Sequence, residues 1–134
     1  MKAMKKVIVI ILILILASIL IYLISHNKPA NKNTYKSITM DEAKEIFKES
    51  GDYIILDVRR DDEYSQGHIP GAINVANEDI NNEPVPELPD LDQTIYVYCR
   101  SGRRSKEASQ KLAEIGYTNI IEFGGIIDWT GEIE

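Results

Sequence analysis

An uninterrupted apolar run near the N-terminus limits how the 134 residues can fold. Within residues 7–24, only Ser18 and Tyr22 carry a polar group. As a helix the run would span roughly 27 Å, close to the thickness of the hydrocarbon core of a bilayer. It has no polar face, and the rest of the chain is too small to enclose it. The run therefore predicts a membrane-spanning helix or the core of a secretion signal, and it leaves enough chain for one domain.

The sequence around the apolar run favours a segment that stays attached. No small-x-small cleavage site follows it, and it is longer than a typical signal core. We therefore expect residues 1–26 to be an uncleaved, single-pass anchor in the cell membrane; the domain would be secreted if the segment were cleaved. The lysines before the run favour a cytoplasmic N-terminus and a domain outside the cytoplasm, while lysines after it weaken that bias.

Composition divides the remaining chain and excludes several functions. Residues 27–34 are polar and include Pro29, which is typical of a short tether. Residues 35–134 form the expected domain, whose ten basic and 21 acidic residues give a net charge of −11 and argue against binding nucleic acid. The single cysteine excludes an internal disulfide and paired-cysteine motifs, and two histidines do not suffice for a metal site, so we expect neither metal nor cofactor.

Short apolar runs alternate with helical patterns in the domain. The expected strands are residues 53–58, 72–75, 94–98 and 119–123, and the expected helical segments are 39–47, 59–64 and 106–115. Thr39 and Glu42 form a capping box at the first helix, and Gly116 is the C-terminal stop of the last. This alternation predicts an α/β fold with a mainly parallel sheet covered on both faces. In such folds ligands bind at the carboxyl ends of strands, beside helix N-termini.

A strand runs directly into Cys99, and a loop rich in arginine and glycine then begins a helix. The helix N-terminus offers unpaired N–H groups, Arg100, Arg103 and Arg104 add full charges, and Gly102 permits a tight curve. These features favour the thiolate and would hold an anion. A lone cysteine is usually a small buried apolar residue. We interpret Cys99 as a nucleophile instead, because three arginines are a costly environment for an inert thiol.

Several motifs occur in order over residues 35–134. They are Leu-Asp-Val-Arg at 56–59, Glu-Tyr at 63–64 with Gly-His-Ile-Pro-Gly-Ala-Ile-Asn-Val at 67–75, Tyr-Cys-Arg-Ser-Gly-Arg-Arg-Ser at 98–105, Gly-Tyr-x-Asn at 116–119, and Phe-Gly-Gly at 123–125 with Trp129. Together they resemble a single-domain rhodanese, which is a sulfurtransferase. The resemblance implies a rhodanese-like fold: a central, mainly parallel five-stranded sheet flanked by helices on both faces, here preceded by one transmembrane helix.

The resemblance also implies roles for individual residues. Cys99 would be the catalytic nucleophile that carries sulfur as a persulfide. The residues that would bind the persulfide and the anionic donor are Arg100, Ser101, Gly102, Arg103 and Arg104. The supporting residues would be Asp57, Arg59, Glu63 and His68. For these we expect mainly structural roles, with Arg59 paired to Glu63 and His68 fixing the bend before Pro70. Trp129 would be core packing.

The expected function is sulfur transfer. Cys99 would take sulfane sulfur from thiosulfate, a persulfide or a polysulfide, and a thiol or cyanide would remove it. One alternative is a module that binds or carries persulfide or polysulfide without turnover. Phosphatase or arsenate reductase chemistry is disfavoured, because cysteine phosphatases place arginine after five intervening residues, whereas four separate Cys99 from Arg104 and Ser105 follows.

Overall fold

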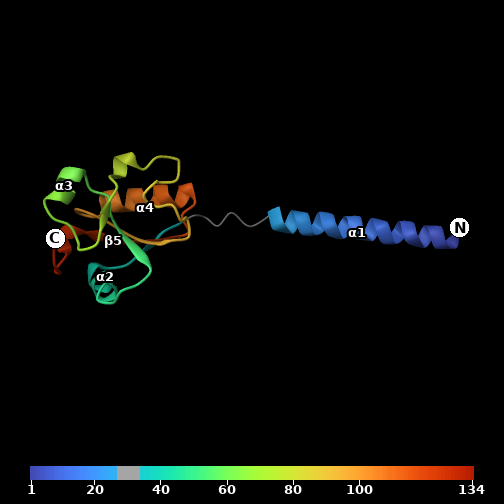
Figure 1. Cartoon of the computed structure of the whole chain (residues 1–134), viewed down its shortest axis with the longest axis horizontal. Helices are drawn as coiled ribbons and strands as arrows, with labels where there is room; N and C mark the ends of the chain where they lie inside the picture. The colour runs from blue at the N-terminus through green and yellow to red at the C-terminus, as the bar shows by residue number, and fades with distance from the viewer. Residues whose placement is uncertain (27–33) are drawn as a thin grey trace. The chain divides into compact units, whose positions relative to one another are not determined.

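The structure is a computed structural model that describes residues 1–26 and 34–134, and the chain forms two compact units, residues 1–32 and 33–134. The first unit is helix α1 (Lys2–His26), drawn in blue in Figure 1. It is the one helix within the described ranges that is long and apolar enough to cross a membrane. The expected tether, residues 27–34, lies outside the described residues except for Thr34.

A single five-stranded sheet forms the centre of the second unit. Its strands are β1 (Lys36–Ser37), β2 (Tyr53–Asp57), β3 (Ile73–Asn74), β4 (Thr94–Cys99) and β5 (Asn119–Gly125). They lie in the order β1-β5-β4-β2-β3, and every neighbouring pair is parallel. The predicted five-stranded sheet is therefore confirmed, and it is parallel throughout. The central strand is β4, which ends at the cysteine.

Helices cover both faces of the sheet, as predicted. They are α2 (Met40–Ile46), α3 (Asp61–Ser65), α4 (Arg103–Ile115) and two short 3₁₀ turns, η1 (Asn77–Asp79) and η2 (Ile126–Asp128). Figure 1 shows α2 and α4 on opposite sides of the strands. Two apolar cores follow from this arrangement: α4 contributes Leu112 to one of them, and α2 contributes Ala43 to the other.

The capping box predicted at Thr39 and Glu42 is present at the start of α2. The Thr39 hydroxyl accepts from the Glu42 N–H, and the Glu42 carboxylate accepts from the Thr39 N–H. Ile46 is 38% exposed, whereas Met40 is buried. The reason is helical geometry: Ile46 lies about 100° around the axis from Phe47, which packs against the core.

The boundaries of β5 and α4 differ from the sequence prediction. Gly124 and Gly125, which follow the strand predicted over residues 119–123, belong to β5, because Gly125 pairs with Cys99 across the sheet. Helix α4 begins at Arg103 instead of residue 106, immediately after Gly102, and ends before Gly116 as predicted. Two of the three arginines therefore lie in the first turn of a helix.

Candidate active site

The Sγ atom of Cys99 lies beneath the loop that joins β4 to α4. Cys99 is the last residue of β4 and is 1% exposed. Its Sγ accepts a hydrogen bond from the Gly102 N–H at 3.0 Å and donates one to Ser105 Oγ at 3.5 Å. The sulfur therefore lies at the carboxyl end of the central strand and at the N-terminus of a 13-residue helix, where the helix dipole favours negative charge.

Two glycines give the loop its shape. Gly102 has φ of 105°, in the left-handed region that residues with a Cβ rarely adopt, and this conformation directs its N–H to the sulfur. At Gly125, a Cβ would lie 2.2 Å from the Arg100 carbonyl oxygen. The same carbonyl accepts from the Ile127 N–H at 3.2 Å. The loop therefore rests directly on the backbone of β5 and the turn that follows it.

The three arginines that follow Cys99 have different surroundings. The Arg104 guanidinium donates two hydrogen bonds to the Glu63 carboxylate, at 2.7 and 2.9 Å. These bonds raise the pKa of Arg104, although desolvation opposes the change. The same bonds lower the pKa of Glu63 from its ordinary 4.5 to about 2. Arg103 is largely exposed and lies 3.5 Å from Glu107, and Arg100 is exposed. Of these three arginines, only Arg104 is held in place by a bidentate ion pair within residues 1–26 and 34–134.

A hollow of about 570 Å³ opens over the loop. Its lining residues are Arg60, Glu63, Glu78, Arg100, Ser101, Arg103 and Arg104. Four guanidinium groups and two carboxylates make the hollow cationic within an otherwise acidic domain. Cys99 lies beneath the loop and does not line the hollow. The surface above the cysteine is thus suited to a small anion.

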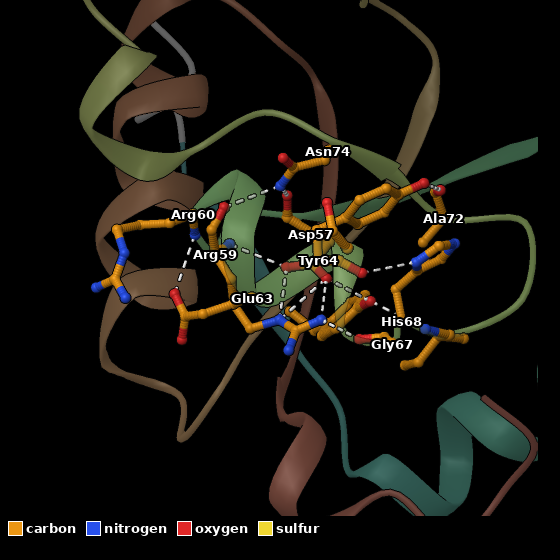
Figure 2. A network of polar contacts seen from close by, with 12 residues as sticks. Asp57, Arg59, Arg60, Glu63, Tyr64, Gly67, His68, Ala72 and Asn74 are labelled. Carbon is orange, nitrogen blue, oxygen red and sulfur yellow. Dashed lines mark hydrogen bonds and ion pairs between the residues drawn. The ribbon is translucent and has the colours of Figure 1, made fainter. Parts of the chain in front are cut away.

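The predicted pair of Arg59 and Glu63 is wrong. Arg59 instead forms a buried ion pair with Asp57, with Nη2 2.6 Å from Oδ2, and also donates to the Gly67 carbonyl at 2.7 Å (Figure 2). Glu63 bonds to Arg104 and to the Arg60 N–H. Arg59 and Glu63 are four residues apart and would share a face only if both lay in a helix. Arg59 precedes α3, so its side chain follows the strand pattern, in which residues two apart share a face.

Asp57 and Arg59 lie on the other face of the sheet from Cys99. The Tyr98 hydroxyl donates to Asp57 Oδ2 at 2.7 Å, and Tyr98 faces α2 whereas Cys99, the next residue, faces α4. Burial raises the pKa of Tyr98, so its hydroxyl stays a donor. The Asp57–Arg59 pair therefore supports the bend at residues 67–71, and Glu63 is the supporting residue that contacts the first turn of α4, through Arg104.

Comparison with known proteins assigns the domain to a family. The family description "rhodanese-like domain" matches residues 39–132. The chain belongs to the rhodanese-like family. The thiosulfate sulfurtransferase PspE of Escherichia coli is 38% identical over 73 residues, which cover 54% of this chain and 70% of PspE.

Solved structures agree with this assignment. A rhodanese from E. coli solved with anions is 35% identical, with a TM-score of 0.56 over 61% of this chain and 96% of that one. A rhodanese-like domain protein from Staphylococcus aureus is 32% identical, with a TM-score of 0.62 over 74% of this chain and 96% of that one. The rhodanese-like fold predicted from the motifs is confirmed.

His68 ties the bend of the rhodanese-like domain to its C-terminus. Its ring stacks on Tyr64 at 3.7 Å between centroids, and its Nδ1 lies 3.0 Å from the Tyr64 carbonyl oxygen (Figure 2). Its backbone exchanges two hydrogen bonds with Glu134, at 2.9 and 3.0 Å. Within residues 34–134, His68 makes no hydrogen bond or ion pair with the cysteine loop.

Two residues of the rhodanese-like site were missed by sequence reasoning. Ser105 and Glu122 are both buried, and their side-chain oxygens lie 2.6 Å apart beside Cys99. The available signal was an acidic residue inside the apolar run at 119–123, which we interpreted only as a strand. No cluster of His, Cys, Asp or Glu that could hold a metal ion is present in the parts of the chain that the structure describes.

Proposed function

We propose that this chain is a sulfurtransferase in which Cys99 takes sulfane sulfur from a small anionic donor and passes it to a thiophilic acceptor. Membership of the rhodanese-like family supports sulfur transfer in general, and a relative from E. coli is named a thiosulfate sulfurtransferase. The main supporting observation is the position of the single cysteine. Its Sγ accepts the Gly102 N–H at the start of α4, beneath a hollow lined by four arginines.

The proposed reaction has two steps and needs only one protein sulfur. The Cys99 thiolate attacks the outer sulfur of thiosulfate, a bond from Sγ to that sulfur forms, and sulfite leaves with the electron pair of the broken S–S bond. A persulfide or polysulfide donor would release a thiolate or a shorter polysulfide instead. An acceptor thiolate or cyanide then attacks the terminal sulfur, and Sγ leaves as a thiolate, which restores the starting state.

The loop would stabilise charge during both steps. The Gly102 N–H, which bonds to Sγ, and the arginine side chains that line the hollow above the loop would stabilise negative charge on the terminal sulfur, in the way that an oxyanion hole acts on oxygen. Arg104, fixed by Glu63, would bind the donor with the least loss of side-chain entropy. Arg100, Ser101 and Arg103 would complete the binding site for the donor anion.

The mass of the intact protein tests sulfur loading. The full chain in detergent is incubated with thiosulfate, a low-molecular-weight persulfide or a polysulfide. We expect a gain of one sulfur atom in the wild-type chain and none in Cys99→Ser. If no donor adds sulfur to the folded wild-type protein, or if Cys99→Ser gains it equally, the proposal is wrong.

Addition of an acceptor distinguishes an enzyme from a carrier. Cyanide added with excess thiosulfate should give thiocyanate in amounts that exceed the protein many times over. One equivalent of thiocyanate and no more would favour the alternative, a module that carries sulfur without turnover. Release of phosphate from an aryl phosphate, lost in Cys99→Ser, would favour phosphatase chemistry instead.

We also propose that α1 anchors the domain in the cell membrane as a single span, with the rhodanese-like domain outside the cytoplasm. The length and composition of α1 support this proposal, as do the lysines that precede the apolar run. Residues 27–34 would serve as the tether to a domain of residues 35–134.

A further inference from the structure

A buried carboxylate that the proposed reaction does not use lies next to the site. Glu122, in β5, is 2% exposed. Its Oε1 lies 2.6 Å from Ser105 Oγ and 2.9 Å from the Gly124 N–H nitrogen, and its Oε2 lies 3.2 Å from Ser37 Oγ. Within the described ranges no Lys, Arg or His forms an ion pair with it. A buried carboxylate without a counter-ion opposes folding, so stability alone does not explain it.

Ser105 connects this carboxylate to Cys99. It is fully buried in the first turns of α4, with Oγ 3.5 Å from Cys99 Sγ and 2.6 Å from Glu122 Oε1. The sheet explains the arrangement. Val97 and Cys99, two residues apart on β4, both face α4, and Glu122 pairs with Val97 across the parallel ladder and so points to the same side. Ser105 approaches from the helix between them.

The surroundings of Ser105 determine where its one hydroxyl hydrogen points. Three oxygen acceptors lie near Oγ: Gly102 O at 2.9 Å, Glu122 Oε1 at 2.6 Å and Gly124 O at 3.4 Å. Oxygen accepts more strongly than sulfur, and a carboxylate most strongly. The hydrogen therefore points away from Cys99 and a lone pair faces Sγ. With the Gly102 N–H on its other side, Sγ has one donor and one acceptor, as a neutral thiol requires.

We propose that Glu122 is a positioning residue that holds the Ser105 hydroxyl and thereby keeps Cys99 in its thiol form, which limits its nucleophilicity. The inference rests on the proposed function, in which Cys99 is the nucleophile. In the loaded protein, the negative charge would lie on the terminal sulfur, about 2 Å beyond Sγ. The Ser105 lone pair therefore disfavours charge on Sγ in the free thiolate more than charge on the outer sulfur of the persulfide, and Cys99 is restrained more before sulfur loading than after it.

Other charged groups face the two sites from the neighbouring elements. A hollow of about 460 Å³ on the Glu122 side is lined by the charged residues Asp41, Lys106 and Asp128, and those lining the hollow over the loop are Arg60, Glu63, Glu78, Arg100, Arg103 and Arg104. None of them has a hydrogen bond or ion pair with Glu122 or Cys99 in the part of the chain that is described. Substitution of Glu122 therefore leaves their direct contacts in place.

The rate of alkylation of Cys99 by iodoacetamide, measured from acid to alkaline pH on the full chain in detergent, tests the inference. The variants are Ser105→Ala, Glu122→Gln and the double variant. The matched control is Glu114→Gln, which removes an exposed carboxylate from α4. We expect each single substitution to speed alkylation at neutral pH by about three- to tenfold and to shift the rate profile to lower pH. The control should match the wild type.

The double variant decides whether Glu122 acts through the hydroxyl. We expect it to react no faster than Ser105→Ala, whereas multiplied effects would mean that Glu122 acts by charge through space and would overturn the inference. Slower alkylation of Ser105→Ala would overturn it as well, because the hydroxyl would then donate to the sulfur. The comparison of Ser105→Ala with the wild type remains a valid test even if circular dichroism shows that Glu122→Gln does not fold.

Sulfur loading measured on the same samples separates the two proposals. If the wild type and all variants fail to gain sulfur from any donor, the proposed function is wrong, and the alkylation rates still report the state of the thiol. If loading is normal and Ser105→Ala and Glu122→Gln alkylate at the wild-type rate, the inference about Glu122 is wrong and the proposed function stands.

Discussion

At the scale of single residues, the buried pair of Asp57 and Arg59 fixes the bend at residues 67–71. Removing the charge of Asp57 leaves Arg59 buried without its partner and the Tyr98 hydroxyl without its carboxylate. We expect Asp57→Asn to lower the free energy of unfolding by about 3–5 kcal/mol. Urea denaturation measures the change. Asp62→Asn, which breaks an exposed ion pair, is the control and should change stability little; equal losses in the two variants would contradict the prediction.

The Glu63–Arg104 pair makes stability depend on pH. Arg104 holds the pKa of Glu63 at about 2, below its ordinary 4.5. The unfolded chain therefore binds this proton first as pH falls. The pair contributes its full stabilisation above pH 4.5 and loses it as pH falls towards 2. We expect Glu63→Gln to be less stable than the wild type at neutral pH, with a difference that shrinks over this window in urea titrations. A constant difference would rule out the electrostatic explanation.

Residue identities were predicted better than residue contacts. The sequence predicted that Cys99 and its arginines lie where a strand ends and a helix begins. This position could be predicted because it depends only on residues that are neighbours in the sequence. The partner of Arg59 was wrong because the exact start of α3 decides whether strand or helix spacing applies. Glu122 was missed because its neighbours come from β1, α4 and the end of β5, which are distant in the sequence.

At the scale of elements, the contact between β5 and the cysteine loop shapes the site. A Cβ at residue 125 would lie 2.2 Å from the Arg100 carbonyl oxygen, which is backbone and cannot rotate away. We expect Gly125→Ala to displace the loop and to lower the rate of sulfur loading from thiosulfate at least tenfold in protein that remains folded. Intact mass against time measures the rate.

The control for this variant must lose stability without moving the loop. Leu88 is fully buried in the core beneath α4, and Leu88→Ala should cost about 2–5 kcal/mol. It should load sulfur at the wild-type rate under conditions where it is folded. If Gly125→Ala also loads at the wild-type rate, β5 does not shape the site.

Element types followed from the sequence, as did the capped start of α2 and the end of α4 at Gly116, but the start of α4 and the end of β5 did not. Alternating apolar runs specify strands and helices because burial requires that periodicity. The start of α4 depended on the left-handed conformation of Gly102, and the extent of β5 depended on pairing with Cys99. One of these ends is therefore set by the backbone conformation at the site and the other by pairing across the sheet.

At the scale of the whole molecule, the proposal of a membrane anchor makes a separate prediction. Every side chain of residues 1–25 is exposed, so α1 has no protein surface to cover it within the first unit. We expect the full chain to remain with membranes after extraction with alkaline carbonate and a chain without residues 1–26 to be released. Protease added to intact cells with a permeable outer layer should digest the domain. Protection of the domain until lysis would reverse the proposed orientation.

Because Cys99 is buried beneath the loop, the width of an approaching reactant decides whether it can reach the sulfur. Only 1% of the residue is exposed, so a reactant must reach it with a narrow end. A linear polysulfide or thiosulfate ends in a single sulfur atom, which is narrow. A cysteine thiol on a flat protein surface is surrounded by other atoms and does not offer such a narrow end. A protein that exchanged sulfur here would have to present its thiol on a protruding, extended tip.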